Sequence, residues 1–101
     1  MRMLMLVQAP HEPFNTLVRE GKAGAVLNAI MDEIKPEAVY FSEMKGKRTF
    51  VLIVEVAAAS RVPALAEPFF LKLQANCEFH IVMSPEDLAR SGLDDIGRRW
   101  A

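Results

Sequence analysis

The chain has 101 residues, of which 51% are hydrophobic and 25% are charged, and its formal net charge is −1. This size allows one domain with one core, and this composition excludes an intrinsically disordered chain. Because 12 basic residues are balanced by 13 acidic ones, no overall positive field would attract nucleic acid or an anionic membrane.

The first half of the chain predicts one strand followed by two helical segments. Residues 3–7 form a continuous apolar run, which is typical of a strand buried on both faces. Apolar stripes at helical spacing occupy residues 14–18 and residues 26–34, but the two stripes are out of phase with each other. Gly21 and Gly24 lie between them, so we predict a break or a kink at this point.

The middle of the chain predicts a β-hairpin and a short helix. Residues 39–44 and 49–56 are rich in aromatic and β-branched side chains, which favours strands. Gly46 lies between them and is free to adopt the positive φ of a tight hairpin. After the hairpin, Ser60 can cap a short helix, and we expect Pro68 to end this helix because proline removes a backbone hydrogen bond.

The last part of the chain predicts a fourth strand and a helical extension. Residues 78–83 have the composition of a strand. Ser84 is then a suitable N-cap, and Pro85 is favoured at the first position of a helix. The chain is therefore predicted to be a single α+β domain over residues 1–101, of βαββαβ order, whose C-terminal extension over residues 84–101 contacts a partner subunit.

The register of the hairpin predicts which strand residues share a face. A loop centred on Gly46 and Lys47 pairs Phe41 with Leu52, Tyr40 with Ile53 and Ser42 with Val51, and directly opposed residues share a face. We expect the helices to cover the apolar face, which holds Val39, Phe41, Phe50, Leu52 and Val54. The other face is mixed and holds Tyr40, Ser42, Val51, Ile53 and Glu55, with Glu78, His80 and Val82 from the last strand.

The mixed face predicts a homodimer. A sheet face that is open to water normally carries polar side chains, whereas a contiguous apolar patch usually marks an interface or a binding surface. A second copy packed sheet against sheet covers such a patch in the simplest way. The expected partners are therefore a second copy of this chain and a small organic ligand, and neither nucleic acid nor a membrane is expected.

The cysteine content and the N-terminal segment predict the compartment. The single cysteine, Cys77, cannot form an internal disulfide, so nothing points to an oxidising compartment, and its place on the helix-covered face predicts an inert core thiol. The apolar segment at residues 1–7 is too short to span a bilayer, and residues 8–13 interrupt it before a signal peptide is complete. We therefore expect a cytoplasmic protein.

Several stretches resemble known proteins. The element order, the mixed face and the stretch from residue 67 (EPFF) to residue 88 (SPEDL) resemble the dimeric α/β-barrel group of ferredoxin-like proteins, such as muconolactone isomerase and the antibiotic-biosynthesis monooxygenases. Residues 11–15 (HEPFN), 35–41 (KPEAVYF) and 63–69 (PALAEPF) are similar to a family of short, uncharacterised bacterial proteins. The resemblance implies the fold, the dimer and a cavity inside each half of the barrel, and it implies no established activity.

Two titratable side chains on the mixed face are candidates for catalysis. An imidazole such as that of His80 can act as a general acid or base near neutral pH, although hydrogen bonds at a dimer interface would also account for it. Glu55 is a candidate base, or else it reaches solvent at the end of its strand or forms an ion pair with a basic group such as Arg2. With one strand between them, their backbones should lie roughly 10 Å apart, on either side of a small ligand.

The remaining candidates would bind a ligand without reacting with it. Tyr40 and Ser42 can donate hydrogen bonds, although a ring packed across the dimer interface with its hydroxyl at the rim would also account for Tyr40. Val51 and Ile53 can line an apolar cavity. Two histidines that are 69 residues apart and one cysteine give no metal-ligand spacing, so we expect neither a metal nor a cofactor. Three hypotheses remain: cofactor-free proton transfer, isomerisation or oxygenation; a ligand-sensing module; and a purely structural homodimer.

Overall fold

The strands form one four-stranded antiparallel sheet. The computed structural model describes residues 1–101, and its elements follow the order β α α β β α β α α. The strands lie in the order β2-β3-β1-β4 and are β1 (Arg2–Ala9), β2 (Ala38–Met44), β3 (Lys47–Glu55) and β4 (Asn76–Ile81). The sheet and the element order confirm the predicted α+β fold of the ferredoxin-like type.

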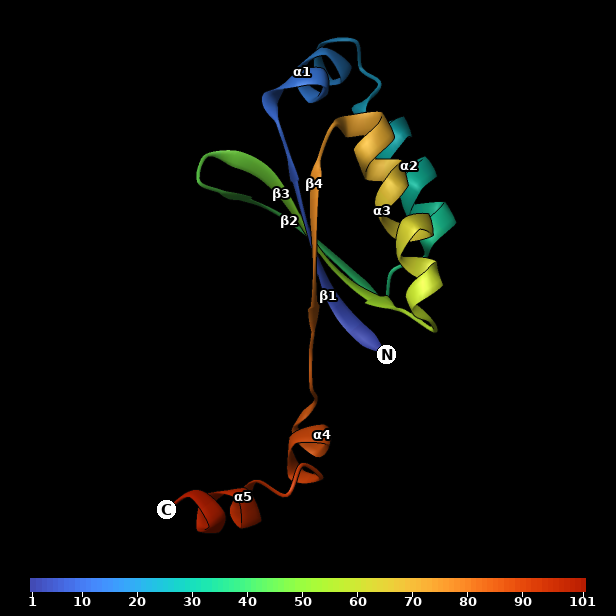
Figure 1. The fold of residues 1–101 in the computed structure, drawn as a ribbon. Helices are drawn as coiled ribbons and strands as arrows, with labels where there is room; N and C mark the ends of the chain where they lie inside the picture. Colours follow the sequence, from blue (N-terminus) through green and yellow to red (C-terminus); the bar gives the residue numbers. More distant parts are fainter.

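The helices divide into a group that packs on the sheet and a group that lies beyond it. The first group covers one face of the sheet and consists of α1 (His11–Arg19), α2 (Ala23–Ile34) and α3 (Val62–Leu73), which follows a 3₁₀ turn, η1 (Ala59–Arg61) (Figure 1). The second group lies beyond the end of β4 and consists of α4 (Pro85–Ala89) and α5 (Leu93–Trp100). None of these helices combines the length and the apolar character needed to cross a lipid bilayer.

The predicted break between the first two helices is confirmed. α1 ends at Arg19 and α2 begins at Ala23. Gly21, between them, has a φ of +71°, a backbone conformation in which an L side chain is strained. The break lets both helices turn their apolar stripes, which are out of phase along the sequence, toward the same core.

The core lies between the helix-covered face and the three helices that pack on it. Two sheet residues in it, Met5 and Leu52, have no exposed surface, and neither have Phe69 and Leu73 of α3. Phe50 links the layers, because its ring lies 6.0 Å from that of Phe14 and 6.2 Å from that of Phe69 between centroids. The predicted helix-facing positions at Phe50, Leu52 and Val54 are buried as expected.

The prediction that Pro68 ends the third helix is wrong. α3 continues through Pro68 to Leu73. A proline inside a helix costs about 3 kcal/mol, but the turns that follow it place two large apolar side chains in the core. Burying one such side chain stabilises a fold by about 1.5–3 kcal/mol, so continuation is favoured. The predicted cap is wrong as well, because Ser60 lies inside η1 and its side chain caps neither helix.

The predicted pairing in the hairpin is displaced by two residues. The turn consists of Lys45 and Gly46 alone, with φ values of 55° and 78°, as in the mirror-image turns that fit the twist of a hairpin. Phe41 therefore lies opposite Phe50 and not Leu52, while Tyr40 lies opposite Val51 and Ser42 opposite Thr49. A displacement by two residues preserves the faces, because strand side chains alternate with a period of two.

The expectation that helices cover Phe41 is also wrong, since 62% of this residue is exposed. Phe41 lies on the correct face and packs edge-on against Phe50, with 5.5 Å between the ring centroids. However, β2 is an edge strand, and the end of the hairpin extends past the helices (Figure 1). The ring is therefore covered on one side only.

Candidate functional site: the open sheet face

The second face of the sheet carries no helix, and we call it the open face (Figure 1). The strand registers arrange its residues in three rows that cross all four strands. The first row is Ala38, Ile53, Leu4 and His80; the second is Tyr40, Val51, Leu6 and Glu78; the third is Ser42, Thr49, Gln8 and Asn76. Every predicted site residue except Glu55 belongs to these rows.

The centre of the open face is apolar and its edges are polar. The two central strands contribute four half-buried side chains, Leu4, Leu6, Val51 and Ile53. On the edge strands the exposed side chains include the hydroxyl groups of β2 and the ionisable groups of β4. An apolar centre surrounded by polar groups is typical of a surface that another molecule covers.

His80 has a carboxylate beside it. Its Nε2 lies 3.4 Å from Oε1 of Glu78, and half of the histidine side chain is exposed. The two residues are two positions apart on β4, so their side chains share the open face. A carboxylate beside an imidazole is the arrangement that orients a general base. Sequence reasoning placed Glu78 on this face but did not pair it with His80, although the spacing of two was a usable signal.

Glu55 lies at the end of β3, away from His80. Its Oε1 is 2.5 Å from the amino nitrogen of Met1, which also donates to the carbonyl oxygen of Val56. Arg2, the basic group considered as its partner, instead pairs with Glu37 at 2.9 Å. β1 lies between β3 and β4, and Glu55 is one row beyond His80, so their backbones are roughly 10 Å apart across the sheet and about 7 Å apart along it. The structure does not bring the two candidates together.

The hydroxyl candidates lie at the edge opposite to the histidine. Tyr40 and Ser42 are on β2, three strand spacings from β4, which is about 14 Å. The tyrosine side chain is exposed, and the serine hydroxyl donates a long hydrogen bond of 3.4 Å to the carbonyl oxygen of Glu43. A small molecule on this face can therefore contact the apolar centre and one edge, but not both edges of the same sheet.

The open face has one hollow, which sequence reasoning did not identify. It has a volume of about 180 Å³ and is lined by Leu6, Gln8, Met44, Lys45, Thr49 and Glu78. The amide of Gln8 donates to the carbonyl oxygen of Met44 at 3.1 Å, which joins β1 to the hairpin. Ligand pockets usually have volumes of about 300–1,000 Å³, so this hollow needs a second wall before it can enclose an organic ligand.

Cys77 lies on the helix-covered face, as predicted. It is half-buried, its Sγ lies 4.0 Å from the carbonyl oxygen of Ala66 in α3, and burial raises its pKa to about 11. The thiolate is the nucleophilic form of cysteine, and only a very small fraction of Cys77 is thiolate in the folded protein at neutral pH. This sulfur is therefore placed for packing and not for catalysis.

We expect Cys77 to react about 100-fold more slowly with iodoacetamide at pH 8 in the folded protein than in the unfolded chain. Burial raises the pKa of the thiol from 9.0 to about 11, so the fraction of thiolate at pH 8 is about a hundredfold smaller in the folded protein. The measurement is the alkylation rate by mass spectrometry, with and without a denaturant. Equal rates in the two states would contradict a packed thiol.

The fold and the open face define the class of this protein, which is a ferredoxin-like α+β domain with helices on one face of its sheet. No cluster of three or more histidine, cysteine, aspartate or glutamate side chains is placed to hold a metal ion. Comparison with known protein families, curated proteins and solved structures finds no match for this chain.

Proposed function

We propose that this chain binds a small organic molecule on its open face, in a cavity that closes when two copies pack sheet against sheet. The observation that carries the proposal is the apolar centre of Leu4, Leu6, Val51 and Ile53, which no part of the chain covers and which polar side chains border. Water-exposed sheets normally place polar groups at such central positions.

A second sheet would supply the missing wall of the site. Stacked sheets lie about 10 Å apart, which leaves space for side chains and, where these are small or turned aside, for a ligand. A two-fold axis would also bring an edge of the partner's sheet over this one. In such a dimer, hydroxyl groups and the histidine edge can approach the same ligand, although they lie about 14 Å apart on one sheet.

The expected roles follow from the chemistry of each group. Val51 and Ile53 contact the apolar part of the ligand, and Tyr40 and Ser42 donate hydrogen bonds to its oxygen atoms. In a catalytic form of the proposal, His80 transfers a proton and Glu78 orients its ring, while Glu55 stays at the end of the sheet. The likeness to the dimeric α/β-barrel proteins and a cytoplasmic location belong to the same proposal.

The test uses the full chain and 8-anilinonaphthalene-1-sulfonate, a small aromatic anion that fluoresces when it leaves water. We expect a dimer by analytical ultracentrifugation and saturable binding of the probe. His80→Ala should weaken binding by about 10- to 100-fold, because one hydrogen bond to a charged group is worth about 1.5–3 kcal/mol. The matched control is His11→Ala, which removes the other histidine from the exposed start of α1.

Three other outcomes would count against the proposal. A dimer that binds the probe without saturation supports a purely structural interface. Equal effects of the two histidine substitutions would remove His80 from the site. A chain that is monomeric at micromolar concentration would overturn the enclosed cavity itself.

A further inference from the structure

The last residues of the chain form an arm that leaves the body. We define the C-terminal arm as residues 82–101, which include α4 and α5 (Figure 1). The molecule measures 59 × 28 × 19 Å, and its radius of gyration is 17.1 Å, compared with about 13 Å for a compact chain of this length. Every residue from Pro85 to the end is exposed. The two helices of the arm therefore gain little stabilisation from their own body.

The start of the arm is held in an extended conformation. Ser84 has φ −75° and ψ 166°, and the following Pro85 disfavours the helical alternative at this position. The Ser84 hydroxyl accepts from the backbone N–H of Asp87 at 3.1 Å, and the Asp87 carboxylate accepts from the backbone N–H of Ser84 at 3.0 Å. The N-cap role of Ser84 was predicted from the sequence, and these two hydrogen bonds fix the direction in which α4 leaves the end of β4.

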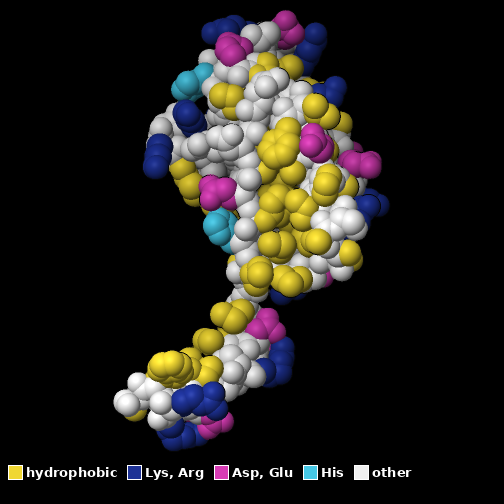
Figure 2. All heavy atoms as spheres, viewed as in Figure 1, with side chains coloured by type: hydrophobic (Ala, Val, Ile, Leu, Met, Phe, Trp, Pro, Cys, Tyr) yellow, Lys and Arg dark blue, Asp and Glu magenta, His cyan; other side chains and the backbone are white.

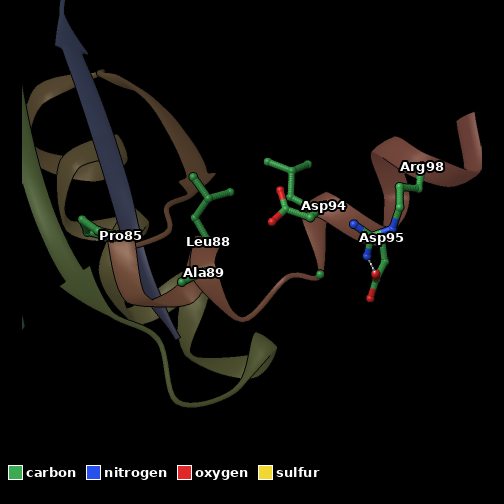
Figure 3. A pocket seen from close by; sticks show the side chains of 8 residues that line it. Pro85, Leu88, Ala89, Asp94, Asp95 and Arg98 are labelled. Carbon is green, nitrogen blue, oxygen red and sulfur yellow. Dashed lines mark hydrogen bonds and ion pairs between the residues drawn. The ribbon is translucent and has the colours of Figure 1, made fainter. Parts of the chain in front are cut away.

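One side of the arm is apolar and uncovered. Leu93, Ile96 and Trp100 are three and four positions apart, so they lie on one face of α5. Figure 3 shows Leu88 of α4 and the pair formed by Asp95 and Arg98 at the border of a hollow of about 590 Å³ between the two helices. Helices of five and eight residues are not stable alone in water, so a further surface must cover this side.

The body offers an apolar hollow next to the start of the arm. We call it the strand-end hollow; it measures about 330 Å³ and is lined by Met1, Met3, Val56, Ala57, Ala58, Ala59, Val62 and Ile81. All eight residues are hydrophobic, and Ile81 is the last residue of β4. Figure 2 shows hydrophobic side chains gathered along this side of the body and continuing onto the arm.

We infer that the C-terminal arm docks into the strand-end hollow of a second copy of this chain. The inference rests on the proposed dimer and specifies how that dimer is held. The three rows of the open face cover roughly 400 Å² in projection, since four strands are about 19 Å wide and six residues about 20 Å long. A stable dimer of standard size buries about 800 Å² on each partner. Side-chain relief makes the accessible area of the open face larger than this projection, so the sheets alone would form an interface of small to standard size, and exchanged arms would enlarge it.

Reciprocal exchange explains both uncovered surfaces. Each copy has one apolar arm and one apolar hollow. In a dimer with a two-fold axis, the arm of each copy can fill the hollow of the other, so that both arms and both hollows are covered. The extended conformation of Ser84 leaves only Val82 and Met83 between β4 and α4 to turn α4 back toward its own hollow. The short connection therefore favours the hollow of a neighbouring copy.

The test uses Trp100, which is the only tryptophan and is 81% exposed. Its fluorescence reports on the arm alone. We expect blue-shifted emission and protection from iodide quenching in the wild-type dimer, with both lost when the protein is diluted to monomer. Ala58→Glu in the hollow should weaken the dimer about tenfold and expose Trp100. The matched control is Ala25→Glu on the exposed side of α2, which should change neither signal.

The alternative outcomes separate this inference from the proposed function. A dimer in which Trp100 is quenched at every concentration would overturn arm exchange and leave the sheet-to-sheet dimer intact. Protection of Trp100 in the diluted monomer would show that the arm folds onto its own body, which also overturns the exchange. A chain that is monomeric throughout would overturn both the exchange and the dimer on which it rests.

Discussion

Phe69→Ala is expected to lower the free energy of unfolding by about 3–5 kcal/mol, the usual cost of removing a large aromatic side chain from a packed core. Phe69 has no exposed surface, and its ring contacts that of Phe50, the residue that links the layers of the core. The substitution removes burial and also leaves a cavity, because the surrounding core relaxes only partly around the empty space. A domain of this size typically has only 5–15 kcal/mol of stability, so much of it would be lost.

The measurement is urea unfolding followed by circular dichroism, at one fixed protein concentration because association would shift the midpoint. The adjacent Phe70 provides the control, since 38% of it is exposed on the same helix. Phe70→Ala should cost markedly less, about 1–2 kcal/mol. Equal losses for the two substitutions would contradict the arrangement in which Phe69 faces the sheet.

The hairpin shows how far local patterns determine the sheet. Alternation of side chains predicted which residues share a face, and this part of the prediction survived an error of two residues in register. The register itself depends on the length of the turn, and a non-glycine residue with positive φ at Lys45 could not be read from the pattern. The face on which a strand residue lies is therefore easier to predict from the sequence than its partner on the neighbouring strand.

The predictions for Pro68 and Phe41 were wrong for a different reason. The environment of each residue is determined by parts of the chain that are distant in sequence. The cost of a proline inside a helix is local, but the burial that offsets it comes from packing α3 on the sheet. Phe41 has the right side chain for a core position, yet its strand is at an edge that the helices do not reach. Neither the packing of α3 on the sheet nor the edge position of β2 can be predicted from the residues next to Pro68 or Phe41.

The candidate site follows the same division. The sequence placed Tyr40, Val51, Ile53 and His80 on one face, and the strand order puts them in adjacent rows there. It named Glu55 as the second titratable group, about 10 Å from His80, and did not identify the carboxylate beside the imidazole, which belongs to Glu78 on the same strand. Two side chains that are two positions apart on one strand share a face, so the proximity of Glu78 to His80 could have been predicted from the sequence. The position of Glu55 relative to His80 depends on the offset between their strands, which the sequence pattern does not give.

Leu6→Lys is expected to dissociate the proposed dimer and to leave the fold of each copy intact. Leu6 is half-buried at the centre of the open face, between Val51 on one side and Glu78 on the other. In a separate copy the lysine can extend its ammonium group into water, so folding loses little. Between two sheets, the ammonium group and the neighbouring Glu78 carboxylate would both lose their hydration, which costs several kcal/mol for each ion even where the two charges pair.

The dissociation constant should therefore rise by about 100-fold or more, as 1.4 kcal/mol corresponds to a tenfold change. Sedimentation velocity over a range of concentrations measures this constant, and circular dichroism checks the fold. Leu71→Lys is the matched control, because Leu71 is 74% exposed on the outer side of α3. If Leu6→Lys associates as tightly as the wild type, the open face is not the interface. If Leu71→Lys dissociates the dimer instead, the copies meet through their helices, and the apolar centre of the sheet would have to be covered by another molecule.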